Sequence, residues 1–269
     1  MLSMLRLSNL KLICNKTELG QLPEGKVLVN TINAHSYNMA QKDEAFAEAL
    51  STIENGNRKN ENETGCVKFL IPDGASIVKA CRWLKAESQP KERLAGWDLF
   101  AFEMQRLNEK GERRDGKWRV MFMGSSEKVL EKIRLRMAKD YPHLEVVTFS
   151  PPYKPVFLEE DDAAIIKAIN EATPDLLWIG MTAPKQEKWA FQHWGELNIH
   201  CHVGTIGAVF DFYAGTMKRA PQWWQDHSLE WFYRFILEPR RMWRRYVIGN
   251  PLFLWNVMKE YVHIHKKRL

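Results

Sequence analysis

An aspartate at the end of a predicted strand is the residue best placed to do chemistry. Residues 67–71 (VKFLI) predict a strand, and Pro72-Asp73-Gly74 follows it directly. Gly74 has no side chain, so a ligand could approach Asp73 closely. A carboxylate there could act as a general base that takes the proton of a hydroxyl nucleophile. Considered alone, an aspartate in this position is more often a turn or helix N-cap residue.

A second group of polar residues begins the helix expected after the strand-like segment 175–180 (DLLWIG). Pro184 suits the first turn of a helix, and its N-terminus would offer free N–H groups to an anion. Lys185 adds a positive charge, and Gln186 and Glu187 could hydrogen-bond the hydroxyl groups of a ligand. The segment is therefore a candidate site for a diphosphate or a sugar, although, considered alone, such a segment is more often an ordinary capped helix start.

Other candidates follow other predicted strands. Gly124-Ser125-Ser126 comes after a strand at 118–123 and could cradle a phosphate. It matches neither the GxGxxG nor the GxxxxGK[ST] pattern, which disfavours a nucleotide-dependent oxidoreductase and a P-loop NTPase. Asp211 could accept hydrogen bonds from a ribose, or it could be one more turn or cap carboxylate.

The sequence predicts neither a metal site nor a cofactor. His200-Cys201-His202 falls on a predicted strand at 199–203, where successive side chains point to opposite faces, so the cysteine cannot share a face with the histidines. The chain also lacks the Asp-x-Asp pair with which many sugar transferases hold a divalent cation. We therefore expect metal-independent chemistry.

Arginines could then offset the charge of a leaving diphosphate, because guanidinium pairs bidentately with phosphate. Arg234, Arg241 and Arg244 are the candidates. Arg241, Arg244 and Arg245 are spaced i, i+3 and i+4, so they share one face of a helix. These side chains could equally be solvated or bind lipid headgroups.

The segments that must position these residues follow an α/β pattern. Strand-like segments alternate with segments whose apolar residues recur at helical spacing, which predicts a parallel sheet with helices on both faces. Ligands of such sheets bind beyond the carboxyl ends of the strands, which is where the candidate residues lie. The predicted strands are 26–31, 67–71, 118–123, 144–149, 175–180 and 199–203.

The last part of the chain has a different composition. Residues 219–269 hold ten Lys/Arg and four Asp/Glu, which accounts for the whole formal net charge of +6, and five of the eleven Trp lie there. Basic and aromatic side chains together suit an anionic membrane surface or a nucleic acid. Glu238-Pro239 should end one helix and begin another. We expect an α/β body at 1–215 and a basic, aromatic-rich helical appendage at 216–269.

Composition and cysteine usage suit a cytoplasmic protein. The hydrophobic share is 45%, the charged share is 27%, and the four cysteines form no CxxC pair, which fits a reducing compartment. The sequence contains no signal-peptide pattern and no apolar run of about 20 residues that could span a bilayer. The polar segment 55–65 is interpreted as an insertion. We expect peripheral binding to the inner face of the cytoplasmic membrane.

Several short motifs in a fixed order are more specific than any one of them. They are Thr31-x-Asn33, Pro72-Asp73-Gly74, Arg93-x-x-Gly96-x-Asp98, Pro184-Lys-Gln-Glu187, Phe210-Asp211-x-x-Ala-Gly215, Arg219-Ala-Pro221, Glu230-Trp231-x-x-Arg234, Glu238-Pro239-x-Arg241 and Arg244-Arg245-Tyr246. This combination resembles the WecG/TagA/CpsF family of glycosyltransferases (glycosyltransferase family 26) from about residue 27 to residue 246.

The resemblance implies a Rossmann-like body and an appendage that docks on the membrane and helps to close the active site. It implies inverting transfer of a sugar, typically N-acetylmannosamine, from a UDP-sugar to N-acetylglucosamine on a polyprenyl diphosphate. The expected partners are therefore the UDP-sugar donor, the polyprenyl-diphosphate-linked acceptor and an anionic membrane surface, with no nucleic acid. The sequence leaves the oligomeric state open, a homo-oligomer included.

The resemblance also implies roles for single residues. Asp73 resembles the family's catalytic base. The expected substrate contacts are Thr31, Asn33, Arg93 and Gln186 for sugar or acceptor, Asp211 for the nucleotide, Tyr153 for the uracil, and Arg234, Arg241 and Arg244 for the diphosphate.

The chain departs from the family pattern in two loops. Residues 180–184 (GMTAP) lack the second glycine that usually precedes the proline, and residues 150–153 (SPPY) replace a glycine-containing turn. Because such loops shape a donor pocket, a glucosyl- or mannosaminuronyl-transferase of an exopolysaccharide pathway stays an alternative. A non-catalytic basic binding module and a family member that has lost activity are further alternatives.

Overall fold

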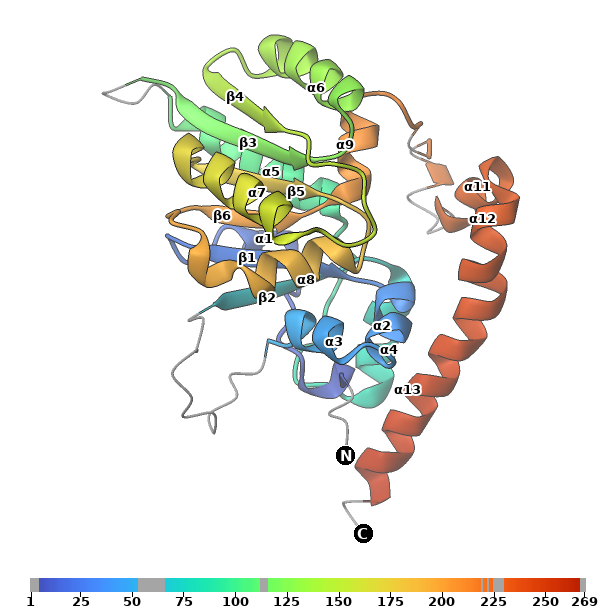
Figure 1. Cartoon of the computed structure of the whole chain (residues 1–269). Helices are drawn as coiled ribbons and strands as arrows, with labels where there is room; N and C mark the ends of the chain where they lie inside the picture. The colour runs from blue at the N-terminus through green and yellow to red at the C-terminus, as the bar shows by residue number, and fades with distance from the viewer. Residues whose placement is uncertain are drawn as a thin grey trace.

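A six-stranded, all-parallel sheet forms the centre of the computed structural model, in the order β2-β1-β6-β5-β3-β4 (Figure 1). The structure describes residues 5–52, 66–111, 116–218, 220–221, 223–224 and 230–266, so the expected insertion at 55–65 lies outside the described residues. The strands are β1 (Val27–Ile32), β2 (Val67–Pro72), β3 (Trp118–Gly124), β4 (Leu144–Phe149), β5 (Leu176–Gly180) and β6 (His202–Thr205).

The predicted α/β class, with a parallel sheet and helices on both faces, is confirmed. The strand order differs from the 3-2-1-4-5-6 order of the dinucleotide-binding fold, because β5 and β6 are inserted between β3 and β1. The last strand, β6, begins at His202 and not at residue 199 as expected. The neighbouring strands β1 and β5 begin at Val27 and Leu176, and both of these residues pair with His202.

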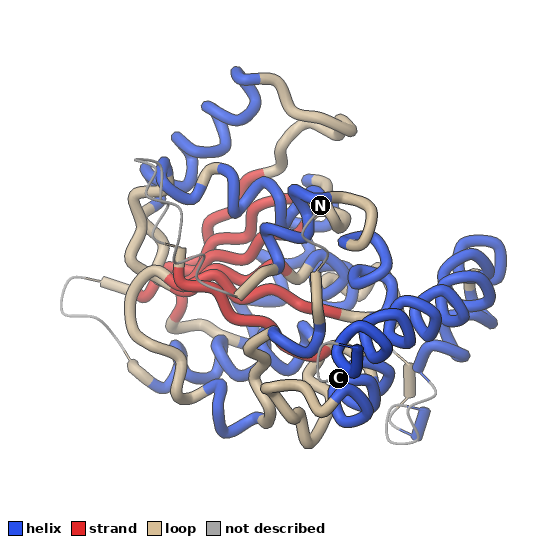
Figure 2. The backbone as a smooth tube through the Cα atoms, turned by 90° about the horizontal axis from the view of Figure 1, so that it is seen from below, coloured by secondary structure: helices blue, strands red, loops and turns tan. Residues whose placement is uncertain are grey.

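Alternating side chains of the strands supply two separate cores. Figure 2 shows the strands with helices on both sides of the sheet. Val120 and Phe122 of β3 point to one face, and Met121 and Met123 point to the other. The first face is covered by α5 (Gly96–Glu109), α6 (Glu127–Asp140) and α9 (Gly207–Tyr213), with α1 (Lys16–Leu19) beside them, and the second by α7 (Glu159–Ala172) and α8 (Lys185–Gln192). Burial on both faces explains why the strands are apolar runs.

A third core lies at the β1–β2 end of the sheet. It joins Ile32 and Leu70 of these strands to helices from both ends of the chain, and Phe253 and Val257 of the C-terminal helix are almost fully buried in it. The helices involved are η1 (Leu7–Asn9), α2 (Ala34–Ala40), α3 (Glu44–Leu50), α4 (Ala75–Leu84) and α13 (Gly249–Lys266).

Buried polar contacts also fasten α13 to the body. The Glu260 carboxylate accepts hydrogen bonds from the Ser8 N–H at 2.8 Å and from the Tyr37 hydroxyl at 2.8 Å. Burial and this carboxylate raise the pKa of Tyr37, which keeps the hydroxyl protonated as a donor. The Asn256 amide donates to Asn38 Oδ1 at 3.0 Å. The helix that ends the described chain is therefore held by the same core as β1, and the expected division at residue 215 stays a prediction.

Three short helical segments precede α13 and carry exposed apolar residues. They are α11 (Glu230–Leu237), α12 (Pro239–Trp243) and the π-helical turn η3 (Arg244–Ile248). Pro239 starts α12, as predicted. No helix in the described ranges is both long enough and apolar enough to cross a membrane. The exposed apolar side chains include Trp231, Ile236, Leu237, Trp243 and Ile248, and on α13 Leu254, Trp255, Met258 and Val262.

Candidate active site

The segments that follow the strands meet at one edge of the sheet, because all six strands run parallel. Asn33 follows β1, Asp73 follows β2, and Gly124 ends β3. Met181 follows β5 and Ile206 follows β6. This arrangement agrees with the expectation that the candidate residues gather beyond the carboxyl ends of the strands.

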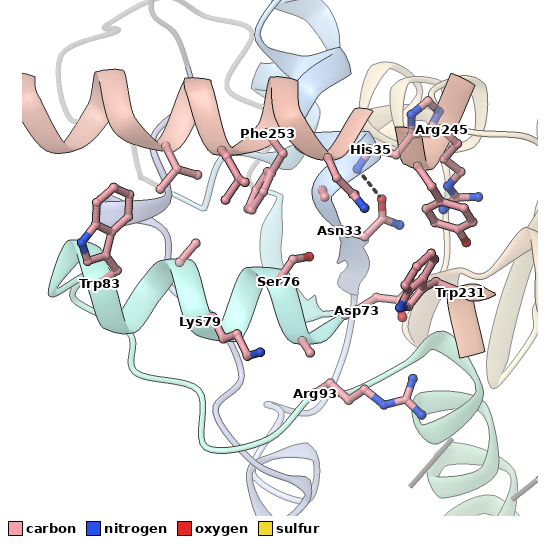
Figure 3. A pocket seen from close by; sticks show the side chains of 18 residues that line it. Asn33, His35, Asp73, Ser76, Lys79, Trp83, Arg93, Trp231, Arg245 and Phe253 are labelled. Atoms are coloured by element: carbon pink, nitrogen blue, oxygen red, sulfur yellow. Dashed lines mark hydrogen bonds between the residues drawn. The ribbon is translucent and has the colours of Figure 1, made fainter. Parts of the chain in front are cut away.

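A cavity of about 530 Å³ lies at the β1–β2 end of this edge, between α4 and α13 (Figure 3). Asn33 and Asp73 enter it from the ends of β1 and β2, and Arg93 enters from the loop before α5. Trp231 of α11 and Arg245 of η3 line the same end of the cavity. Segments from three distant parts of the sequence thus form one site.

The backbone around Asp73 is held on both sides. Its N–H donates to the Ile32 carbonyl at 2.8 Å, and the Pro72 carbonyl accepts from the Leu94 N–H at 3.0 Å. Gly74 then turns the chain into α4 with φ = +127°, a conformation that strains any residue with a side chain. These contacts place the Asp73 carboxyl and Arg93 at the same end of the cavity.

Asn33 has a fixed position because it caps α2. Its Oδ1 accepts hydrogen bonds from the N–H groups of His35 and Ser36, each at 3.0 Å, and its own N–H donates to Ser36 Oγ at 2.8 Å. Thr31 lies two residues earlier in β1 and is not among the residues that line the cavity.

The cavity is electropositive. Lys79, Arg93 and Arg245 line it, whereas Asp73 is the one acidic side chain in the lining that the structure describes. Partial burial and the nearby Arg245 charge lower the pKa of His35, which also lines the cavity. Such a site suits an anionic ligand with a hydroxyl close to a carboxylate.

Gln186 and Glu187 point into the protein and not into this cavity. Gln186 Oε1 accepts hydrogen bonds from the N–H groups of Met181 at 3.1 Å and Gly207 at 3.2 Å, so it joins the loops after β5 and β6. Gln186 Nε2 donates to Glu187 Oε1 at 2.8 Å, and burial raises the pKa of the Glu187 carboxyl to about 7. Both side chains therefore sit where they support the backbone.

The turn at Gly124-Ser125 is tightly packed. A Cβ at Gly124 would collide with the Gly180 carbonyl, and the Ser125 N–H donates to that carbonyl at 2.9 Å. Asp211 is half-buried and its Oδ1 accepts from Thr216 Oγ1 at 2.9 Å. Gly124 and Ser125 lie at the end of β3, and Asp211 lies within α9, the helix that follows β6; none of the three lines the cavity.

Tyr153 lies in the loop that follows β4, and Lys185, the first residue of α8, lies beside this loop. Lys185 Nζ donates to the Lys154 carbonyl at 2.6 Å and lies 3.2 Å from the centre of the Phe157 ring. The Tyr153 side chain is fully exposed. Neither residue lines the cavity between α4 and α13.

The arginine of η3 that lines the cavity is one that the site prediction did not include. Arg244 is exposed outside the cavity, and Arg245 lines it. The side chains of Arg234 and Arg241 lie outside the described part of the structure. The helical spacing already placed Arg245 on the face shared with Arg241 and Arg244.

The cavity also contains residues of α4 that the sequence analysis did not select. Ser76, Lys79 and Trp83 line it at spacings of three and four residues, which is one face of a helix. That periodicity was available from the sequence, but only the position of α13 identifies this face as the wall of a cavity.

His202 is a structural residue. Its Nδ1 lies 2.9 Å from Glu103 Oε1, and its Nε2 lies 2.9 Å from the Pro23 carbonyl oxygen. Among the described residues, no group of three His, Cys, Asp or Glu side chains could hold a metal ion. The expectation of metal-independent chemistry stays a prediction.

Comparison with known proteins assigns the chain to a family. Residues 12–267 match the model of the Glycosyl transferase WecG/TagA/CpsF family. The chain is 28% identical over 233 residues to the N-acetylglucosaminyldiphosphoundecaprenol N-acetyl-beta-D-mannosaminyltransferase of Bacillus subtilis (strain 168), which covers 87% of this chain and 79% of that protein. The protein of the same name in Staphylococcus aureus (strain NCTC 8325 / PS 47) is 24% identical over 256 residues, 94% of this chain and 88% of the relative. With a family match over nearly its whole length, the chain belongs to the WecG/TagA/CpsF glycosyltransferases, which are enzymes that transfer sugars from nucleotide donors.

Proposed function

We propose that this enzyme transfers N-acetylmannosamine from UDP-N-acetylmannosamine to N-acetylglucosamine carried on a polyprenyl diphosphate, in the synthesis of a cell-envelope polymer. The names of the relatives point to this donor and acceptor. The observation that carries the proposal is the position of Asp73, a carboxylate in a cavity that is also lined by the cationic side chains of Lys79, Arg93 and Arg245. An acceptor with a diphosphate and a sugar hydroxyl matches that combination of charges.

In the proposed reaction, Asp73 removes the proton from the acceptor hydroxyl as its oxygen attacks the anomeric carbon of the donor sugar. A new glycosidic bond forms on the face opposite to UDP, the bond from the anomeric carbon to the UDP oxygen breaks, and UDP leaves with the bonding electron pair. The anomeric configuration is thereby inverted. Lysine and arginine side chains of the cavity pair with the diphosphate of the acceptor.

We place the donor nucleotide beside this cavity, along the carboxyl edge formed by β3, β5 and β6. Parallel sheets bind nucleotides beyond this edge. Asp211 after β6 and the turn at Gly124-Ser125 after β3 lie there. Residues 180–184, which depart from the family pattern, border the same edge. The identity of the donor sugar is therefore the part of the proposal that the donor panel below must test.

We further propose peripheral attachment to the cytoplasmic face of the membrane. The exposed apolar residues of α11 and α13, such as Trp231, Leu254 and Trp255, lie in the segment that carries the net positive charge of the chain. Apolar side chains that insert at the lipid interface, with basic residues around them, bind anionic bilayers. A lipid-borne acceptor would meet the enzyme at this surface.

The test is release of UDP from a panel of donors in the presence of a lipid diphosphate N-acetylglucosamine acceptor. The panel contains UDP-N-acetylmannosamine, UDP-N-acetylglucosamine, UDP-glucose and UDP-N-acetylmannosaminuronic acid, each with and without EDTA. We expect acceptor-dependent UDP release from the first donor, unchanged by EDTA. Release from another donor alone would reassign the sugar, and no release from any donor would refute the proposed activity.

A further inference from the structure

The cavity at Asp73 continues as an apolar groove between α4 and α13. In Figure 3 it runs from Asp73, Arg93 and Trp231 at one end to Trp83 at the other. We define the prenyl groove as the part lined by Ala80 and Trp83 of α4 and by Phe253, Leu254 and Val257 of α13. Its walls are hydrocarbon, whereas the Asp73 end is polar and charged.

We propose that the prenyl groove binds the first isoprene unit of the acceptor lipid. This inference rests on the proposed function, since it assigns a place to the tail of the same acceptor. A hydrocarbon chain that enters an apolar groove leaves water, and this burial stabilises the complex by roughly 25 cal/mol for each Å² of apolar surface.

The order of the side chains along α4 matches the order of the chemical groups in the acceptor. Asp73 lies just before the helix, Lys79 lies in its middle, and Trp83 lies in its last turn. The acceptor carries its sugar hydroxyl, its diphosphate and its prenyl chain in the same sequence. With a hydroxyl at Asp73, the diphosphate would lie near Lys79, and the prenyl chain would extend toward Trp83.

The length of the groove limits what it can recognise. From Ala80 to Trp83 the helix rises about 4.5 Å, at 1.5 Å for each residue. This length suits the first isoprene unit and is far too short for a whole polyprenyl chain. The rest of the lipid must therefore leave the groove into an apolar environment.

Such an environment begins where the groove ends. Leu254 lines the groove and is also 63% exposed on the outer face of α13, next to the exposed Trp255 and Met258. At the far end Trp83 stacks on Tyr261, with the ring centres 4.9 Å apart and the planes within 4°. Trp and Tyr favour the boundary between water and lipid, so the mouth of the groove is suited to lie at the membrane surface.

The decisive measurement compares the binding of two soluble probes to the full-length protein by calorimetry. Both probes are diphosphates of N-acetylglucosamine, one esterified with a methyl group and the other with farnesyl, which has three isoprene units. We expect the farnesyl probe to bind at least about tenfold more tightly, a difference of about 1.4 kcal/mol. Equal affinities of the two probes would overturn the proposal.

Two variants and a matched control locate the source of this preference. Leu254→Ser and Trp83→Ala each remove apolar wall from the groove and should lower the farnesyl preference about threefold or more. Met258→Ser makes a comparable change on the same outer face of α13, outside the groove, and should leave the preference unchanged. Equal losses in Leu254→Ser and Met258→Ser would overturn the assignment to the groove.

A separate readout distinguishes this proposal from the proposed function. Affinity for the methyl probe, together with thermal unfolding, checks that each variant keeps its fold and its charged end. UDP release with the same two probes tests transfer. If no donor supports transfer to either probe, the proposed function is contradicted. The proposal that the groove binds the prenyl chain is tested only by the ratio of the affinities for the farnesyl and methyl probes.

Discussion

The starts of α4 and α8 look alike in sequence and differ in what their polar residues do. Each helix follows a strand at the same edge of the sheet, and each has acidic or amide side chains near its first turn. At α4, Asp73 lies in a cavity with Lys79 and Arg245. At α8, Gln186 and Glu187 are buried and bonded to the backbone and to each other.

The difference comes from the elements that cover the two helices. The loops after β5 and β6 pack closely beside α8, where the N–H groups of Met181 and Gly207 need an acceptor that Gln186 supplies. Over α4 the neighbouring element is α13, and the two helices leave a cavity between them. A strand end with polar residues thus indicates the edge where a site forms, but not which residues contact the ligand.

The largest expected effect is that of Asp73→Asn. An amide cannot remove the proton from the hydroxyl of the acceptor sugar. We therefore expect kcat to fall by about 10²–10⁴-fold, while UDP binding changes little. Steady-state kinetics and UDP titration measure the two effects. A variant with normal turnover would remove Asp73 from the mechanism and with it the contrast between the two helix starts.

The next effect is on stability. Gln186→Ala removes the acceptor of two partly buried N–H groups, and we expect a loss of about 1–3 kcal/mol in the free energy of unfolding, measured with urea. Gln186→Glu keeps an oxygen acceptor and should lose less. Unchanged stability of Gln186→Ala together with a raised KM would show that Gln186 contacts a ligand, as its sequence position suggested.

A pH-dependent effect should distinguish Glu187. Its pKa is about 7 in the folded protein and 4.5 in a model peptide, so the folded state keeps a proton that the unfolded chain loses between these values. Stability therefore falls as the pH rises through this window. We expect Glu187→Gln to be more stable than the wild type by about 1–3 kcal/mol at pH 8, and nearly equal to it at pH 5. An equal difference at both pH values would contradict this assignment.

The smallest effect sharpens the contrast between two adjacent arginines. Arg245 lines the cavity and Arg244 is exposed, so Arg245→Gln should raise the acceptor KM about fivefold, near 1 kcal/mol, and Arg244→Gln should change it less than about twofold. Initial rates with the acceptor as the varied substrate measure both. The reverse order would mean that η3 turns its other face to the substrate.

The sequence by itself determined the architecture and the edge where the site forms. Apolar runs such as those of β3 and β5 predict strands buried on both faces, and helices between them require parallel pairing. Because the carboxyl ends of parallel strands share an edge, Asn33 and Asp73 could be placed near each other before any contact was known. The ordered combination of short motifs between Thr31 and Tyr246 carried the family resemblance, which the family match confirms.

Only the tertiary structure decided which face of each helix meets a ligand. The sequence pattern of residues 241–245 places several arginines on one face, yet Arg245 enters the cavity because α13 is held in place by Glu260, whose carboxylate bonds to Ser8 more than 250 residues away. Gln186 turns inward because two loop N–H groups lie beside it. The physical reason is that periodicity is a local property of the chain, whereas burial of a face depends on contacts between segments far apart in sequence.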